Sequence, residues 1–262
     1  MSTVSARPDG ATWLPPRAGS RPGSAARPLA AGSNLDYYLV QPDNRDFAGP
    51  AGILVEEFRL DEDHSAVRLD STGWTAGGSR WQGASAFSRG IRTDAALRDR
   101  VVGANRQEVE FVYRHLGGGE LPGEEVLRGY FDAGIRLPTS APLRLNPGPA
   151  TAGFAETRVY RVFFTAGLDA DGLTGLLATW RMTPGHGTTG VLTGVAGTAR
   201  RRIGADAFTW ELRRIGAGAA WCLDLTADLA GSRDDAVGPL LRELTTAARM
   251  AGLIPVTTER LR

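Results

Sequence analysis

The clearest pattern in the chain is a strict alternation of apolar and polar residues in the stretches "FTWELR" and "WCLDL" of the second half. Successive residues of a strand point to opposite faces of its sheet. The alternation therefore predicts Trp210 and Trp221 on an apolar face, and Glu211, Arg213 and Asp224 on the opposite face. We expect the aromatic face to pack under helices and the charged face to be open.

The sequence Arg-Arg-Ile-Gly-Ala occurs at residues 201–205 and again at residues 213–217. Each copy is predicted to end a strand and to enter a tight turn, in which Gly204 and Gly216 supply a positive φ. Consecutive antiparallel strands run in opposite directions. The two arginine pairs are therefore predicted at opposite ends of the sheet rather than in one cationic patch.

The order of patterns over residues 154–262 is strand, helix, three strands, helix and strand. The helices are predicted in "DADGLTGLLATWRM" and "RDDAVGPLLRELTTAARMAG", and the last strand in "IPVTTERL". This β-α-β-β-β-α-β order predicts an antiparallel sheet with helices on one face, close to a ferredoxin-like sandwich with an extra strand.

Residues 34–136 are predicted to form a separate α+β module. Its strands are expected in "NLDYYLVQP", "GILVEEFRLD" and "SAVRLDSTGW", which are rich in β-branched, aromatic and leucine residues. "GGSRWQGASAFSRG" is expected to be a loop. Asn105 and Glu108 resemble a capping box that opens a helix.

A second helix of this module is expected in "LPGEEVLRGYFDAG". Its apolar face is predicted to consist of Val126, Leu127, Tyr130 and Phe131. The two helices have helix-turn-helix proportions, but the second opens with two glutamates, which a phosphate backbone repels. We therefore expect a helical hairpin that packs on the first sheet.

Two segments carry no hydrophobic periodicity. Residues 1–33 are rich in Pro, Arg, Gly and Ser and are predicted to be a disordered tail without the apolar stretch of a signal peptide. Residues 137–153 contain four prolines and are predicted to be a linker.

Composition gives the chain no strong electrostatic preference. The formal net charge is +1, and all 30 basic residues are arginine, which indicates a GC-rich bacterial genome. An arginine cluster is therefore weaker evidence for a nucleic-acid partner than it is in an ordinary composition. The single cysteine excludes an internal disulfide and favours the cytoplasm, and no segment is apolar enough to span a membrane.

Candidate catalytic residues are few. His186 lies in the glycine-rich loop 184–190, where active-site groups often occur. Asp169 and Asp171 follow the first strand of the second half and are expected to cap the next helix rather than to hold Mg²⁺. The three histidines lack metal-ligand spacing, so we expect neither a metal nor a cofactor.

Two further motifs have simpler structural explanations. Arg213, Gly216 and Gly218 match an Arg-x-x-Gly-x-Gly spacing that binds pyrophosphate in acyltransferases, but a strand pattern follows where a helix would be needed. Cys222 is expected to be a small buried hydrophobe in a strand, with no cation obviously beside it.

These patterns favour a non-catalytic cytoplasmic adaptor, regulatory or assembly protein that contacts another protein or a second copy of itself. An enzyme with a dispersed site near residues 184–190 is the alternative, and single-stranded nucleic-acid binding is the third hypothesis, disfavoured because the aromatic residues point inward. The residues expected to carry the interaction are Arg200, Arg201, Arg202, Glu211, Arg213 and Asp224.

Overall fold

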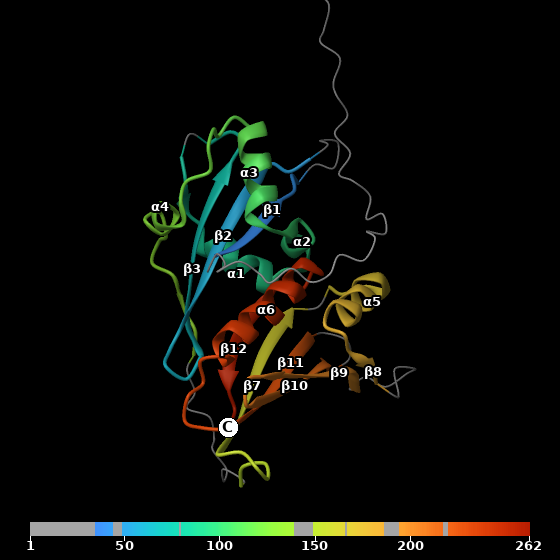
Figure 1. Cartoon of the computed structure of the whole chain (residues 1–262). Helices are drawn as coiled ribbons and strands as arrows, with labels where there is room; N and C mark the ends of the chain where they lie inside the picture. Colours follow the sequence, from blue (N-terminus) through green and yellow to red (C-terminus); the bar gives the residue numbers. More distant parts are fainter. Residues whose placement is uncertain are drawn as a thin grey trace, which may run out of the picture.

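The computed structural model describes residues 35–43, 49–78, 80–138, 149–165, 167–185, 194–216 and 220–262. Within these ranges the chain forms two antiparallel sheets and six helices, so the α+β class expected from the sequence is confirmed. Figure 1 shows the first sheet above the second, with helix α6 (Val237–Met250) between them. The predicted tail, 1–33, lies outside the described residues.

The first sheet has strand order β4-β3-β2-β1-β5, and β6 pairs with β3. Its strands are β1 (Asp36–Val40), β2 (Gly52–Leu60), β3 (Ala66–Thr75), β4 (Gln82–Gly83), β5 (Val101–Ala104) and β6 (Ile135–Arg136). Its helices are α1 (Ser85–Thr93), α2 (Ala95–Arg98), α3 (Arg106–His115) and α4 (Glu124–Arg128). The three strands expected from the sequence correspond to β1, β2 and β3.

Both faces of the first sheet are covered along the middle of its strands. On one face, Tyr37 and Ile53 pack with Val109 of α3 in one apolar cluster. On the other face, Leu54 packs with Ile91 of α1, and Ile254 of the second half joins the same cluster. The first sheet is therefore an inner layer of the molecule.

Two expectations for the helices of the first half need correction. "GGSRWQGASAFSRG" is not a loop throughout, because it contains β4 and most of α1. Helix α4 is only one turn long, so Leu127 is buried while Val126 and Tyr130 are 53% and 41% exposed. The capping box is confirmed: the Asn105 side chain accepts from the backbone N–H of Glu108, and the Glu108 carboxylate accepts from that of Asn105.

The second sheet has strand order β12-β7-β11-β10-β9-β8. Its strands are β7 (Glu156–Thr165), β8 (Thr183–Pro184), β9 (Gly194–Ile203), β10 (Asp206–Ile215), β11 (Ala220–Leu229) and β12 (Pro255–Arg260). Helix α5 (Ala170–Thr179) follows β7, and α6 follows β11. The predicted element order is confirmed, with the two-residue strand β8 added.

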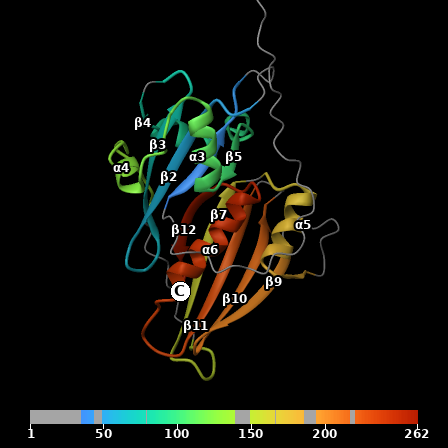
Figure 2. The same cartoon turned by 45° about the horizontal axis from the view of Figure 1, so that its top comes forward.

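Helices α5 and α6 cover one face of the second sheet, as Figure 2 shows. Trp210 and Trp221 lie in the core beneath them and are only 2% and 6% exposed. The predicted inward direction of the aromatic residues is therefore confirmed. It follows from the same alternation that the other face of β9, β10 and β11 carries the polar residues.

The repeated Arg-Arg-Ile-Gly-Ala segments end strands, as predicted. Gly204 forms the β9–β10 turn with a φ of +60°, and Gly216 begins the next connection with a φ of +66°. Arg201 pairs with Phe208 near one end of β10, whereas Arg214 pairs with Gly194 near the other end. The two arginine pairs therefore lie at opposite ends of the sheet. Ala217 and Gly218 lie outside the described residues.

Two arginines join the sheets. Arg92 of α1 donates to the backbone oxygen of Pro255 at 2.9 Å, and the buried Arg249 of α6 donates to that of Ala104 at the same distance. A Cβ at Gly103 would lie 2.4 Å from the backbone oxygen of Arg249, so glycine permits α6 to approach β5. The linker predicted at 137–153 stays a prediction, since residues 139–148 are not among those described.

None of the helices in the described ranges is long and apolar enough to cross a membrane.

Candidate functional site

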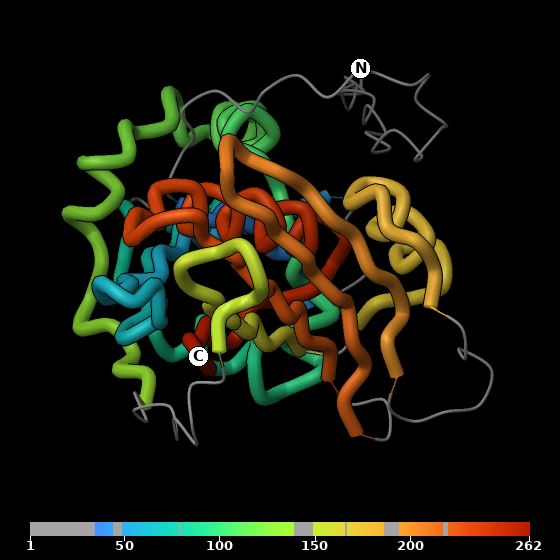
Figure 3. Tube along the Cα trace, turned by 60° about the horizontal axis from the view of Figure 1, so that its bottom comes forward, coloured from blue at the N-terminus to red at the C-terminus, as the bar shows by residue number. Residues whose placement is uncertain are grey.

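The face of the second sheet opposite α5 and α6 is the first candidate site, and we call it the open face. In Figure 3, where the bottom of the molecule comes forward, strands β9 and β10 are seen with no helix in front of them. The strand registers place these residues on the open face: Arg161, Phe163, Arg200, Arg202, Thr209, Glu211, Arg213, Cys222, Asp224 and Thr226.

Opposite charges pair across the centre of the open face. Arg161 of β7 donates from Nε and Nη2 to the two carboxylate oxygens of Asp224 at 2.6 and 2.7 Å. Arg213 donates to Glu211 at 3.0 Å, and its Nε lies 3.6 Å from Asp224. The hydrogen bond with Asp224 raises the pKa of the Arg161 guanidinium. The face therefore presents charged groups that orient one another, as the alternation predicts.

The three consecutive arginines of β9 do not share one face. Arg201 points to the helix side, where it binds the carboxylate of Glu243 on α6 with two hydrogen bonds of 2.7 Å and lies over the ring of Trp210. Arg200 and Arg202 point to the open face. Neither forms an ion pair with any described residue. Arg202 donates to the backbone oxygen of Ala205, at 3.4 Å. Five of the six residues expected to carry the interaction therefore lie on the open face, and Arg201 does not.

Cys222 lies on the open face but is only 1% exposed. Burial raises the pKa of its thiol to about 11, and the neighbouring Asp224 acts in the same direction. Arg161 and Arg213 oppose the rise, so cations do lie beside this cysteine, contrary to the expectation from the sequence. The thiol is protonated at neutral pH, which fits a small buried residue and not a nucleophile.

Of the candidate catalytic residues, the structure describes Asp169 and Asp171. Asp169 caps α5 by accepting from the backbone N–H of Gly172 at 2.7 Å, as expected, and Asp171 is exposed in the first turn of that helix. His186 and most of the loop 184–190 lie outside the described residues. Within the described part of the chain, no group of three or more His, Cys, Asp or Glu residues is arranged to hold a metal ion.

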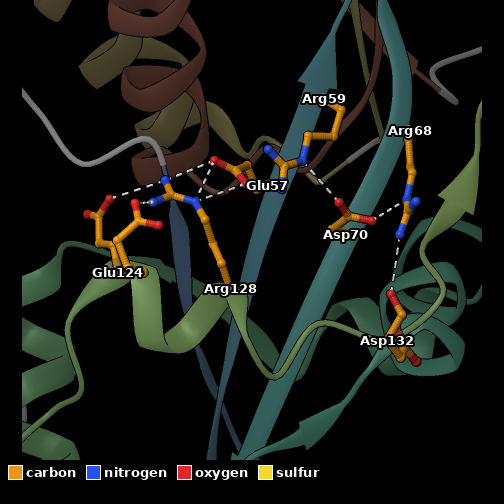
Figure 4. Close-up of polar contacts among 8 residues, drawn as sticks. Glu57, Arg59, Arg68, Asp70, Glu124, Arg128 and Asp132 are labelled. Carbon is orange, nitrogen blue, oxygen red and sulfur yellow. Dashed lines mark hydrogen bonds and ion pairs between the residues drawn. The ribbon is translucent and has the colours of Figure 1, made fainter.

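A second polar cluster lies on the first sheet and was not recognised in the sequence. Figure 4 shows Arg128 reaching from α4 to Glu57 of β2, and Arg59 bridging Glu57 and Asp70. Glu57 and Asp70 face each other in the β2–β3 register, and both are nearly buried, at 6% and 4% exposed. Arg68 also pairs with Asp70. We call this group the β2–β3 charge network.

Each carboxylate of the β2–β3 charge network is already bound by arginine. Arg128 donates from Nη2 to Glu57 at 2.9 Å, and Arg59 donates from Nε to Asp70 at 3.1 Å. The hydrogen bond with Glu57 raises the pKa of the Arg128 guanidinium. The network therefore ties α4 to the sheet. The signal for it in the sequence is the alternation of Glu57 with Arg59 and of Arg68 with Asp70.

The opposite face of β2 holds a more deeply buried ion pair. Both Arg92 guanidinium nitrogens Nη1 and Nη2 lie 2.8 Å from the Glu56 carboxylate, whose side chain is fully buried. The Ser88 hydroxyl donates to the same carboxylate. Because Arg92 also binds the backbone oxygen of Pro255, this pair lies where the two sheets meet.

Comparisons of the chain with protein-family models, with curated proteins and with solved structures gave no match. The assignment of a function therefore depends on the geometry of the chain itself.

Proposed function

We propose that this chain is a non-catalytic binding protein, an adaptor, regulator or assembly component, that contacts an acidic surface of another protein through the open face of its second sheet. One observation carries the proposal. The open face combines charged groups held in place by one another with two arginines, Arg200 and Arg202, that no described carboxylate neutralises. A surface with unmatched cations favours a partner that supplies carboxylates.

The paired charges support a protein partner over a nucleic acid. Arg161 and Arg213 are engaged by Asp224 and Glu211, so they offer little net charge to a phosphate backbone. The large aromatic residues of this sheet are buried under α5 and α6, where bases cannot stack on them. An interface with a protein needs neither of these features.

The described residues give less support to an enzyme. Asp169 serves as a helix cap, and the acids of the β2–β3 charge network are bound by arginines. A cytoplasmic, reducing location remains part of the proposal, because the single cysteine cannot form an internal disulfide. The proposal also includes a bacterial source and a division of the chain into the modules 34–136 and 154–262.

The test is co-purification of the tagged full chain at native abundance, before and after the substitution Arg213→Glu. Arg213 is half-exposed on the open face, so we expect its reversal to weaken recovery of an acidic partner at least about tenfold. The control is Arg233→Glu, because Arg233 is highly exposed and lies in the connection between β11 and α6. Equal recovery from both variants, or elution of the wild-type chain as a lone monomer, contradicts the proposal.

A thermal-shift screen distinguishes the enzyme alternative. Nucleotides, acyl-CoA and divalent metals are added singly to the full chain. Stabilisation of several degrees by one class would replace the adaptor hypothesis with a small-molecule site. We expect no such shift.

A further inference from the structure

The outer edge of β9 is paired over only part of its length. Strand β8 pairs with Thr198 and Gly197, and the backbone N–H of Gly185 donates to the oxygen of Ala196 at 2.9 Å. From Ala199 to Ile203, β9 pairs with β10 on one side and with no described residue on the other. We call this stretch the β9 edge. The β9 edge is the C-terminal half of the strand. The strand begins at Gly194, the first described residue after the gap at 186–193.

An unpaired strand edge is a template for another strand. Alternate residues of a strand direct their backbone N–H and C=O groups away from the neighbour with which the others pair. On the β9 edge these groups have no partner strand in the described part of the chain, and the side chains from Arg200 to Ile203 are exposed. An extended segment of a partner protein can satisfy such groups by adding a strand to the sheet.

The side chains of the β9 edge select the charge of that segment. Arg200 and Arg202 lie on the open face, two residues apart, so carboxylates at alternate positions of an added strand would lie opposite them. Arg201, on the helix face, is already bound by Glu243. Within the described part of the chain, the edge therefore offers two cations without a carboxylate partner on one face and a neutralised one on the other.

The same arginines exclude a second copy of this chain as the occupant. If two β9 edges paired, the consecutive arginines of each would lie against those of the other, and like charges directly opposite are destabilising. Charged edge residues are a common defence against such pairing. The arginines that oppose self-association therefore attract an acidic strand.

We propose that the β9 edge, Ala199–Ile203, binds an extended acidic segment of a partner protein as an additional strand, with carboxylates at alternate positions paired with Arg200 and Arg202. This inference rests on the proposed function, of which it specifies the partner chemistry and the binding mode.

The test is an NMR titration of the isotope-labelled full chain with short peptides. The probe alternates glutamate and threonine, and the control peptide has lysine in place of glutamate. A third peptide is N-methylated at alternate residues, so that it keeps its charges but loses the backbone donors on one edge. We expect shifts of the 199–203 amides with the first peptide only, since only it supplies both carboxylates and a complete hydrogen-bonding edge.

The matched variant is the double substitution Arg200→Glu and Arg202→Glu, compared with Arg233→Glu, which lies in the connection between β11 and α6, away from the edge and the open face. We expect the double variant to bind the glutamate peptide at least about tenfold more weakly, with Arg233→Glu close to wild type. Circular dichroism of both variants establishes that they fold.

Three outcomes overturn the inference. Undiminished binding of the N-methylated peptide excludes strand addition. Salt-sensitive shifts of the same amides with a single-stranded oligonucleotide, and none with the peptide, assign the edge to nucleic acid. Co-purification of a partner that depends on Arg213 but is unaffected by the double substitution leaves the proposed function intact and removes the β9 edge from it.

Discussion

The two sheets use the same pair of chemical groups, arginine and carboxylate, in opposite ways. In the first sheet, Glu56 and Glu57 are buried under α1 and α4, and an arginine from the covering helix binds each of them. In the second sheet, Glu211 and Arg213 remain partly exposed on the open face, with no described helix above them. The comparison shows that a charged strand can either hold a covering helix in place or form a surface. Which of the two occurs depends on what packs above the strand.

The largest effect is expected from breaking the buried pair of the first sheet. Arg92→Met leaves the Glu56 carboxylate buried without its cation, which should lower the free energy of unfolding by about 3–5 kcal/mol. Urea denaturation measures the loss. The double variant with Glu56→Gln removes the uncompensated charge and should recover much of it. A loss below about 1 kcal/mol in the single variant would mean that the first sheet does not depend on this pair.

A smaller loss is expected at the β2–β3 charge network. Arg128→Ala removes the hydrogen bonds that hold α4 to Glu57 and should cost about 1–2 kcal/mol, because both side chains retain slight contact with solvent. Hydrogen exchange of α4 should accelerate at the same time. Arg114→Ala, which removes an exposed pair within α3, is the control and should change stability by less than about 0.5 kcal/mol. An equal loss of stability in Arg128→Ala and Arg114→Ala would contradict the conclusion that the β2–β3 charge network holds α4 to the sheet.

On the open face the same chemistry should contribute little to stability. Asp224→Asn keeps the shape of the side chain but removes the charge that binds Arg161, and we expect a loss of about 0.5–1 kcal/mol in thermal unfolding. A loss as large as that of Arg92→Met would show that this face is covered by something, and so would weaken the contrast between the sheets.

The smallest effect at neutral pH concerns Cys222. Its pKa of about 11 lies above the ordinary thiol value, so between about pH 9 and pH 11 the unfolded chain releases the thiol proton while the folded chain keeps it. The unfolded state then binds fewer protons, and stability falls as pH rises through this window. Since Tyr38 and Tyr160 also have raised pKa values, the measurement is the difference between the wild type and Cys222→Ser. Parallel stability curves above pH 9 would contradict the raised pKa.

Local patterns in the sequence were sufficient for much of the second half. The alternation around Trp210 identified the buried face, because the strands of this meander are adjacent in the chain and follow one period. Asp169 and Asn105 were recognised as helix caps, since a cap depends on residues within one turn. The same alternation applied to β9 would have separated Arg201 from its two neighbours, because Arg201 shares a face with Ala199.

The first half depends more on contacts between distant residues. The glycine and serine content of residues 77–90 predicts a loop where most of α1 forms, because Ile91 and Arg92 contact strands that are far away in the sequence. The adjacent glutamates of β2 were recognisable as strand residues. Their arginine partners, 36 and 71 positions away, could not be read from the local pattern. Val126 is exposed because α4 is short. The helical spacing alone predicts a longer helix than the structure has.

Helix α6 has a mechanical consequence for both sheets. Its Glu243 holds an arginine of β9, and six residues later, about 9 Å along the axis, Arg249 is fixed to backbone oxygens of the first sheet. A helical segment this short bends little, so a displacement of one of its ends also moves the other end. Because α6 contacts both sheets within this length, we expect a displacement of either sheet to move α6, and a spectroscopic label at the exposed Met250 would report that movement.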